Sequence, residues 1–343
     1  MDTAKVEALV QALTSLSLAD LRRLGKAVER QVTAKQAAVV EATDRPRCPA
    51  CQSENPYRWG KTGTTTPRWR CRCCRKTFTA LTGTPLAFNR RRPELMATAH
   101  DMLSDTPHSC RTLAETLGVH WMTVWRWRIK VLRAIDGYGD HGLAGLVEAD
   151  ETFFRESRKG SREWALHSKN NGPAPPRPRW RDFDHKKAKL PRGLSRWQIP
   201  VLVLRDRHDA TYAWRLPSLK STSFDPILDE VLAPDAMLCS DGGAVYRRWG
   251  KARNRLVEQV NSRKGIRVRE GVFHIQNANA YHSRFKDFMR PFRGPSARHL
   301  NLYIGWMVFR DRLRGTAIEG NPLVERLLRD GRKPDTTRKR AGP

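Results

Sequence analysis

Two short apolar runs that end in aspartate decide how this chain folds: Leu146–Asp150 (LVEAD) and Ala236–Asp241 (AMLCSD). A buried strand that ends in a carboxylate brings an oxygen ligand to the rim of a sheet, and two such strands side by side can hold a divalent cation. Either aspartate alone is also compatible with a helix cap or a loop turn. The rest of the chain has to decide between these interpretations.

The composition indicates a polyanionic partner. The 343 residues include 64 Lys and Arg against 35 Asp and Glu, which leaves a formal net charge of +29. This excess favours nucleic acid over a membrane, because the sequence has no run of ~18 apolar residues and no amphipathic lipid-facing segment. The N-terminus lacks the basic-then-apolar order of a secretory signal. We therefore expect a cytoplasmic, nucleoid-associated protein.

The cysteine spacing predicts a zinc site. Five of the seven cysteines lie between positions 48 and 74, and Cys48-x2-Cys51 is separated from Cys71-x2-Cys74 by nineteen residues. Paired knuckles of this kind form closed tetrahedral Zn²⁺ sites that are structural, because no position remains for water. Cys73 is a spare, since the two-residue spacing favours Cys74. The segment between the pairs predicts ribbon strands, and the alternative is a set of unligated cysteines.

Two helical regions flank this ribbon. Residues 4 to about 42 carry leucines and valines at helical spacing, with Ser17 and Asp20 resembling a capping box. From residue 92 to about 135 a second region contains a glycine turn at Gly118 between two short helices, which is typical of a helix-turn-helix. Its second helix offers four candidate DNA contacts: His120, Thr123, Arg126 and Arg128. The alternative is a helical hairpin with tryptophans in its core.

From about residue 145 the order of elements predicts an α/β fold. Strands are expected over 146–154, 198–205, 211–216 and 237–241, and helices over 223–232, 244–251, 279–290 and 297–313. A basic insertion at 157–196 and a basic tail at 316–343 have little apolar periodicity. Both are compatible with phosphate binding or with merely solvated charge.

Two carboxylates need a third oxygen donor to hold two metal ions, and Asn279 is the best candidate. Asn279 and Lys286 are seven residues apart, so on a helix they share a face. One would offer a carbonyl oxygen to the metal and the other an ammonium to phosphate. Glu151 is the nearest alternative ligand but points to the opposite strand face from Asp150, whereas Glu148 shares that face. His274 and His282 are expected to be structural.

At this point the chain resembles bacterial insertion-sequence transposases of the DDE type, in the ISXO2-like branch with an N-terminal zinc ribbon. The likeness is carried by blocks that occur in order from about residue 45 to 310. They are 48–51 (CPAC), 70–78 (RCRCCRKTF), 81–86 (LTGTPL), 147–154 (VEADETFF), 240–242 (SDG), 279–286 (NAYHSRFK), 292–294 (FRG) and 303–306 (YIGW).

The resemblance implies an RNase H-like catalytic core, a mixed sheet flanked by helices, in which Asp150 and Asp241 are the first two metal-binding acids. The third position, glutamate in most of the superfamily, falls on Asn279, followed by Lys286. The implied domains are an N-terminal helical segment (1–44), a zinc ribbon (45–80), a helix-turn-helix (81–136), the catalytic domain (145–315) and the tail (316–343).

The implied activity is DNA transposition with Mg²⁺ or Mn²⁺ as the catalytic ion. The N-terminal elements would bind the terminal inverted repeats of an insertion sequence, and the core would cut double-stranded DNA and join it to target DNA. Two element ends require a homodimer or higher oligomer on DNA. Two rivals remain open: a DNA-binding regulator with an inactive core, and an RNase H-like nuclease that hydrolyses without joining.

Overall fold

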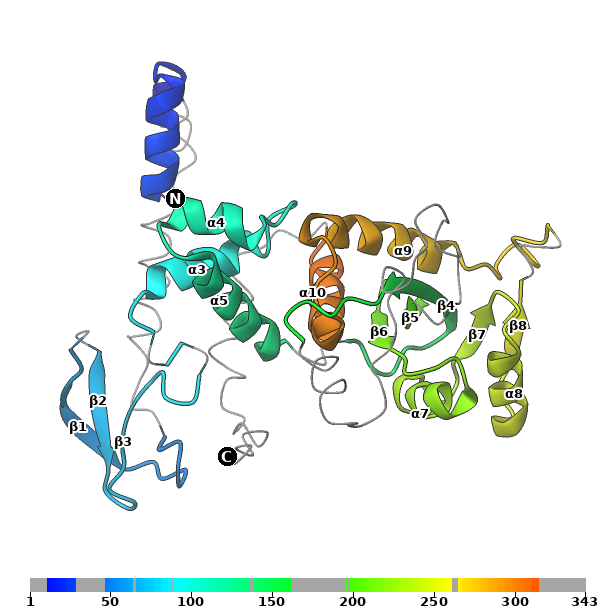
Figure 1. Ribbon diagram of the computed structural model, residues 1–343. Helices are drawn as coiled ribbons and strands as arrows, with labels where there is room; N and C mark the ends of the chain where they lie inside the picture. The colour runs from blue at the N-terminus through cyan, green and yellow to red at the C-terminus, as the bar shows by residue number, and fades with distance from the viewer. Residues whose placement is uncertain are drawn as a thin grey trace, which may run out of the picture. The chain divides into compact units, whose positions relative to one another are not determined.

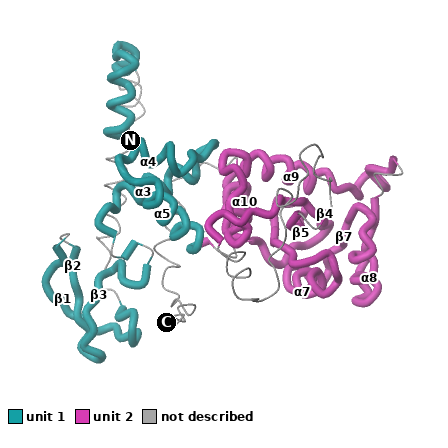
Figure 2. The backbone as a smooth tube through the Cα atoms, viewed as in Figure 1, with its two compact units in different colours: residues 1–134, 319–343 teal, residues 135–318 magenta. Residues whose placement is uncertain are grey.

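The protein divides into two compact units, whose described residues lie within 1–134 and 135–318 (Figure 2). The computed structural model describes residues 11–28, 47–63, 66–84, 86–87, 89–135, 139–161, 195, 198–260 and 265–314. Most of the predicted basic insertion, the whole predicted tail and part of the N-terminal helical segment lie outside these residues. No helix among the described residues is long and apolar enough to cross a membrane.

The first unit begins with the N-terminal helical segment. Residues 18–28 are helical, and the backbone N–H of Asp20 donates to the Ser17 hydroxyl at 3.2 Å. Ser17 also donates to the Asp20 carboxylate at 2.6 Å, so the expected capping interaction is present. The predicted leucine stripe is exposed on this helix, with Leu18 and Val28 among the most exposed apolar side chains.

The ribbon is a three-stranded antiparallel sheet. Its strands are β1 (Pro56–Lys61), β2 (Pro67–Cys71) and β3 (Thr77–Thr79), in the order β1-β2-β3. Side chains alternate across β2, so Trp69 and Cys71 face a small core with Phe78, whereas Arg68 and Arg70 face away. The core contains few apolar residues, and a domain of this size needs a metal for stability.

Three helices complete the described part of this unit: α3 (Arg92–Asp101), α4 (Cys110–Leu117) and α5 (Trp121–Ala134). Helix α4 begins where the Ser109 hydroxyl accepts the Thr112 N–H, and it ends at Gly118, whose φ of 62° is in the left-handed region that glycine favours. Leu113, Ala114 and Val124 pack between α4 and α5. This is the predicted helical pair around a glycine turn.

The second unit contains a five-stranded mixed sheet in the order β6-β5-β4-β7-β8 (Figure 1). Strands β4, β5 and β6 are antiparallel neighbours, whereas β7 and β8 run parallel to β4. This order and these directions are those of an RNase H-like core. The strand bounds are β4 (Leu146–Arg155), β5 (Gln198–Asp206), β6 (Thr211–Arg215), β7 (Met237–Ser240) and β8 (Val257–Gln259).

Helices cover both faces of this sheet (Figure 1). They are α7 (Ser221–Val231), α8 (Ala244–Arg253), α9 (Gln276–Met289) and α10 (Leu300–Arg312). The odd-numbered residues Val147 and Ala149 of β4 pack with α7 and α8 in the main core. The even-numbered residues face α9, where Phe154 meets Phe285 at 4.7 Å between ring centres. The central strand therefore presents a different set of side chains to each helical layer.

Candidate active site and DNA-binding elements

Asp150 lies in the middle of the central strand. It is opposite Val203 of β5, on the β4 face that meets α9. Its side chain is 14% exposed, and one carboxylate oxygen accepts the Glu151 backbone N–H at 2.9 Å. A carboxylate in this position has lost most of its water, so its ionised form depends on a nearby positive charge.

Asp241 follows the neighbouring parallel strand. Ala149 of β4 is in register with Ser240 of β7, so the next residue along each strand is a catalytic candidate. Burial, and next the negative charge of Asp241, raise the pKa of Asp150 to about 7. A buried carboxylate and a second one at the matching position of the adjacent strand offer oxygen donors of the kind that a hard divalent cation prefers. The residues present fit a Mg²⁺ or Mn²⁺ site.

One face of α9 is turned toward Asp150. The Nδ1 atom of His282 lies 3.6 Å from the Asp150 carboxylate, and burial, followed by the charge of Lys286, lowers the pKa of His282 to about 4. Lys286, one turn later, acts on Asp150 in the opposite direction from Asp241 and lowers its pKa. Asn279 lies one turn before His282 on the same face. The charges of Asp241 and Lys286 thus both act on Asp150, and Asn279 shares the helix face that carries Lys286.

Glu148 fixes the start of α9 to the strand that carries Asp150. Its fully buried carboxylate accepts the Ala278 backbone N–H at 2.8 Å and the Asn277 side-chain amide at 3.0 Å. A carboxylate at a helix N-terminus also interacts favourably with the helix dipole. Asn279 is the next residue, so Glu148 helps to set its position. The carboxylate is occupied by these contacts, which makes it a poor reserve metal ligand.

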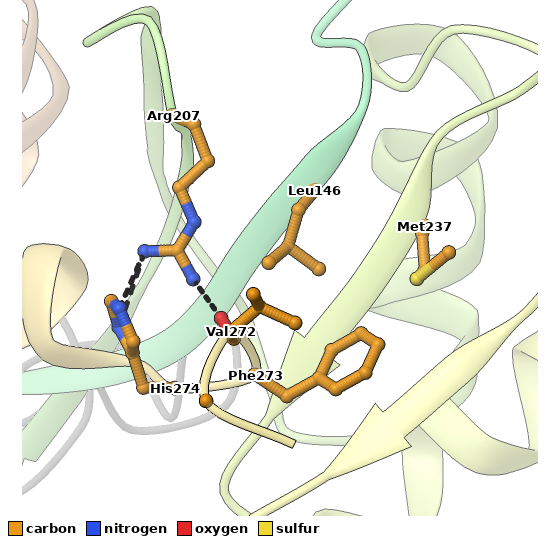
Figure 3. Close-up of a pocket in the computed structure, with 7 residues that line it drawn as sticks. Leu146, Arg207, Met237, Val272, Phe273 and His274 are labelled. Atoms are coloured by element: carbon orange, nitrogen blue, oxygen red, sulfur yellow. Dashed lines mark hydrogen bonds between the residues drawn. The ribbon is translucent and has the colours of Figure 1, made fainter. Parts of the chain in front are cut away.

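Arg207, in the turn after β5, holds Glu148 in place. We call Glu148 and Arg207, with their contacts to the start of α9, the anchor. Its guanidinium pairs with Glu148 at 2.5 Å and donates to the Val272 carbonyl at 2.7 Å. The same guanidinium lies 3.0 Å from the His274 ring, and these side chains line a cavity of about 570 Å³ with Leu146, Met237 and Phe273 (Figure 3). His274 is therefore part of the anchor, as its predicted structural role requires.

Glu151 points away from Asp150, as the alternation of the strand predicts. Its carboxylate accepts a hydrogen bond from the Tyr246 hydroxyl of α8, on the opposite face of the sheet. Burial is the main cause of its raised pKa. The loop between Asp241 and α8 is held by Gln259, whose side-chain amide donates to the Gly243 carbonyl at 3.0 Å.

The sequence did not predict that Glu148 and Arg207 hold the start of α9, or that the Tyr246 hydroxyl donates to the Glu151 carboxylate. The only signal for Glu148 was its spacing of two residues from Asp150. Arg207 and Tyr246 have no distinguishing local pattern.

The four predicted zinc ligands form one cluster. The sulfur atoms of Cys48, Cys51, Cys71 and Cys74 all lie within 4.8 Å of one another. The pairs Cys48–Cys74 and Cys51–Cys71 are 3.5 Å apart, close to the ~3.8 Å that a tetrahedron with Zn–S bonds of ~2.3 Å requires. The backbone N–H of Cys74 is the main cause that lowers the pKa of Cys71 to about 6, whereas the Cys71 sulfur and burial raise the pKa of its partner Cys51 to about 12. Cys71 is therefore the first of this pair to become a thiolate, the form that binds metal.

Two matching backbone turns build this cluster. The N–H of Gln52 donates to the Cys48 carbonyl at 2.8 Å, and the N–H of Arg75 donates to the Cys71 carbonyl at 3.1 Å. Gln52 and Arg75 each have a φ of 60°. Each turn thus places the residue after its second cysteine in the left-handed region. Cys73 is exposed and is not in the cluster, in agreement with its predicted role as a spare.

The candidate DNA contacts on α5 divide into two groups. Arg126 is exposed, Thr123 is half-buried, and His120 caps the helix by accepting the Met122 N–H at 3.3 Å. Arg128 was predicted as a DNA contact, and the structure contradicts this. Arg128 is 1% exposed, and its guanidinium donates to the His108 carbonyl at 2.8 Å and pairs with Asp101. It joins α3 to α5 inside the helical domain.

Comparisons with known proteins identify the family of the second unit. Residues 142–311 match the family model described as the ISXO2-like transposase domain. These residues belong to the ISXO2-like transposase family. A Halobacterium salinarum protein described as an uncharacterized protein in transposable element ISH50 is 27% identical over 265 residues, which cover 75% of this chain and 82% of that protein. The ISXO2-like domain contains all four candidate catalytic residues, and the zinc ribbon precedes it.

Proposed function

We propose that this transposase binds the terminal inverted repeats of an insertion sequence and catalyses metal-dependent cleavage and transfer of DNA strands. The proposal is supported by the register that places Asp150 and Asp241 at matching positions of adjacent parallel strands, by the charges of Asp241 and Lys286 that act on Asp150, and by the match to the ISXO2-like transposase domain. Each of these residues lies far from the others in sequence, so the fold is what joins them.

Asp150, Asp241 and Asn279 would hold Mg²⁺ or Mn²⁺, which supplies activation of a water or 3′-hydroxyl nucleophile and stabilisation of the leaving oxygen. Burial, and next the negative charge of Asp241, raise the pKa of the Asp150 carboxyl. A bound divalent ion would favour its ionised form. The low pKa of His282 keeps its imidazole neutral at pH 7, so it does not compete for the Asp150 carboxylate as a cation.

Lys286 would bind the backbone phosphate beside the scissile bond. Lys286 is exposed, and its charge acts on Asp150. An ammonium on a flexible stem binds phosphate as a point charge. The amide of Asn279 in place of a third carboxylate leaves the site with one less negative charge, which reduces repulsion of the DNA backbone.

DNA recognition would use the exposed side of α5 together with the positive charge of the chain. Arg126, Lys130 and Arg133 are exposed at helical spacing on α5. The net charge of +29 predicts that phosphate contacts dominate the affinity and that binding weakens steeply with salt. Joining two element ends requires two catalytic units, so we infer a homodimer or higher oligomer on DNA.

A cleavage assay tests the proposal. Purified protein, labelled end-sequence DNA and Mg²⁺ or Mn²⁺ should give a nicked product, and added target DNA should give a joined product. Asp150→Ala and Asp241→Ala should abolish both products while DNA binding is retained. Cutting without joining would identify a nuclease instead. Binding with no cutting, unchanged by Asp150→Ala, would identify a DNA-binding regulator.

A further inference from the structure

The hairpin of β1 and β2 has two chemically different faces. One face carries Trp69 and Cys71 and packs on the zinc cluster. The other face begins with the cross-strand pair Tyr57 and Arg70, whose Cα atoms are in register. Because side chains alternate along each strand, Trp59 lies on the same side as Tyr57, and their rings meet edge to face at 5.6 Å.

This second face is a row of alternating aromatic and guanidinium groups. The Arg70 guanidinium lies 4.6 Å from the centre of the Trp59 ring, and the Arg72 guanidinium lies 5.1 Å from the centre of the Tyr57 ring. The Arg68 side chain donates to the Trp59 carbonyl at 3.3 Å, which fixes a third arginine beside the row. We call Tyr57, Trp59, Arg68, Arg70 and Arg72 the aromatic–arginine face.

Core packing does not account for Trp59. Its residue surface is 41% exposed, and the small apolar core lies on the other side of the sheet. The cation–π contacts hold the ring in place without burying it. A large flat ring that lies against the Arg70 guanidinium and is partly open to solvent suits single-stranded nucleic acid, in which bases stack on aromatic side chains and phosphates pair with basic ones.

We propose that the aromatic–arginine face binds unpaired nucleotides of DNA, with a base stacked on Trp59 and adjacent phosphates paired with the arginines. A duplex offers only its backbone and groove edges to such a surface, because the flat faces of paired bases are stacked on one another. The aromatic component therefore selects unpaired DNA, such as a strand freed at a cut or distorted end. The proposal rests on DNA as the substrate of the proposed function, but it does not depend on the cleavage chemistry.

The test compares two DNA probes with the full-length, zinc-loaded protein, without added Mg²⁺ or Mn²⁺. One probe is a blunt duplex, and the other is the same duplex with a single-stranded tail of about eight nucleotides. The tailed probe should bind more tightly. Trp59→Ala should remove this preference, with a loss of roughly tenfold or more in affinity for the tailed probe, and should leave the blunt duplex unchanged. Trp59→Phe should keep most of the preference.

Trp121→Ala is the matched control. Trp121 is 39% exposed but lies at the start of α5, outside the ribbon. It should leave the difference between the two probes intact, and zinc content should be unchanged in every variant. Equal loss on both probes with Trp59→Ala, or no loss on the tailed probe, would overturn the proposal. If either of these results is found while the wild-type protein still cuts DNA, only this inference fails. If the wild-type protein binds neither probe, the proposed function fails as well.

Discussion

The zinc cluster and the acidic site differ in how far apart in the chain their ligands lie. The four thiols come from two short turns. Each turn has the same pattern of hydrogen bonds and has left-handed backbone at the residue after its second cysteine. The acidic site gathers Asp150, Asp241 and the 279–286 segment from separate elements of a mixed sheet and its covering helix. A site built from local turns can be recognised from the spacing of its residues, and disruption of one turn is enough to destroy it. A dispersed site depends on residues that hold its elements in register.

The largest effect should come from breaking one turn of the local site. Cys74→Ser removes a thiolate from the cluster, so the ribbon should lose its metal and its fold. Zinc content and circular dichroism of the purified protein measure this. Cys73→Ser is the matched control and should keep a full complement of zinc. Zinc loss in Cys73→Ser alone would move the fourth ligand to that position.

A smaller effect is expected when the anchor of the dispersed site is weakened. Glu148→Gln removes the charge that holds Arg207 and the first turn of α9, so Asn279 should shift relative to Asp150. Mn²⁺ affinity, measured by calorimetry without DNA, should fall about 10- to 100-fold, the range typical of residues that orient metal ligands.

Asp229→Asn provides the control for Glu148→Gln. Asp229 pairs with Arg253 and accepts the Trp249 indole N–H at 2.9 Å, between α7 and α8. It should lower thermal stability without changing Mn²⁺ affinity. Equal Mn²⁺ affinity in Glu148→Gln and the wild type would show that α9 does not depend on this carboxylate.

The acidic site should also make stability depend on pH. The pKa of an aspartate in the unfolded chain is about 4. In the folded protein, burial and the charge of Asp241 raise the pKa of Asp150 to about 7. Between these values the folded protein keeps a proton that the unfolded chain has lost, so stability falls as the pH rises through this window.

Without divalent metal, Asp150→Asn should therefore raise the Tm at about pH 8 and change it little at about pH 4. Differential scanning calorimetry at the two pH values measures this. Added Mn²⁺ should stabilise the wild type at the higher pH and have little effect on the variant. In Asp229→Asn the sign reverses, because the hydrogen bond from Arg253 lowers the pKa of Asp229. An equal rise in Tm at both pH values in Asp150→Asn would show that the burial of the Asp150 charge does not cause the effect.

The smallest effect should come from relieving strain in the zinc turns. Gln52 and Arg75 occupy left-handed backbone at φ 60°, which glycine adopts without steric cost. Gln52→Gly and Arg75→Gly should each raise zinc affinity slightly, by a few-fold at most, as measured by competition with a chelator. A Gly60→Ala change, at a φ of 75° outside the turns, should not raise it.

What the sequence predicts follows the same division. Cys48–Cys74, the Gly118 turn and the main strands and helices of the second unit depend on local spacing, and the structure has each of them within a few residues of the expected bounds. Arg128 was assigned wrongly because its partner, Asp101, is 27 residues away and no local pattern joins them. Arg207 was missed for the same reason, since it meets Glu148 across 59 residues. The catalytic roles of Asp150, Asp241, Asn279 and Lys286 remain predictions that the cleavage assay tests.

Strand β4 and helix α9 are matched in spacing, because Glu148 and Asp150, two residues apart, meet successive turns of α9. Two residues of strand advance about 6.6 Å, against about 5.4 Å for a helical turn, so the two scales agree over only a short stretch. One codon gained or lost in β4 ahead of Asp150 would turn this carboxylate to the opposite face of the sheet, away from α9.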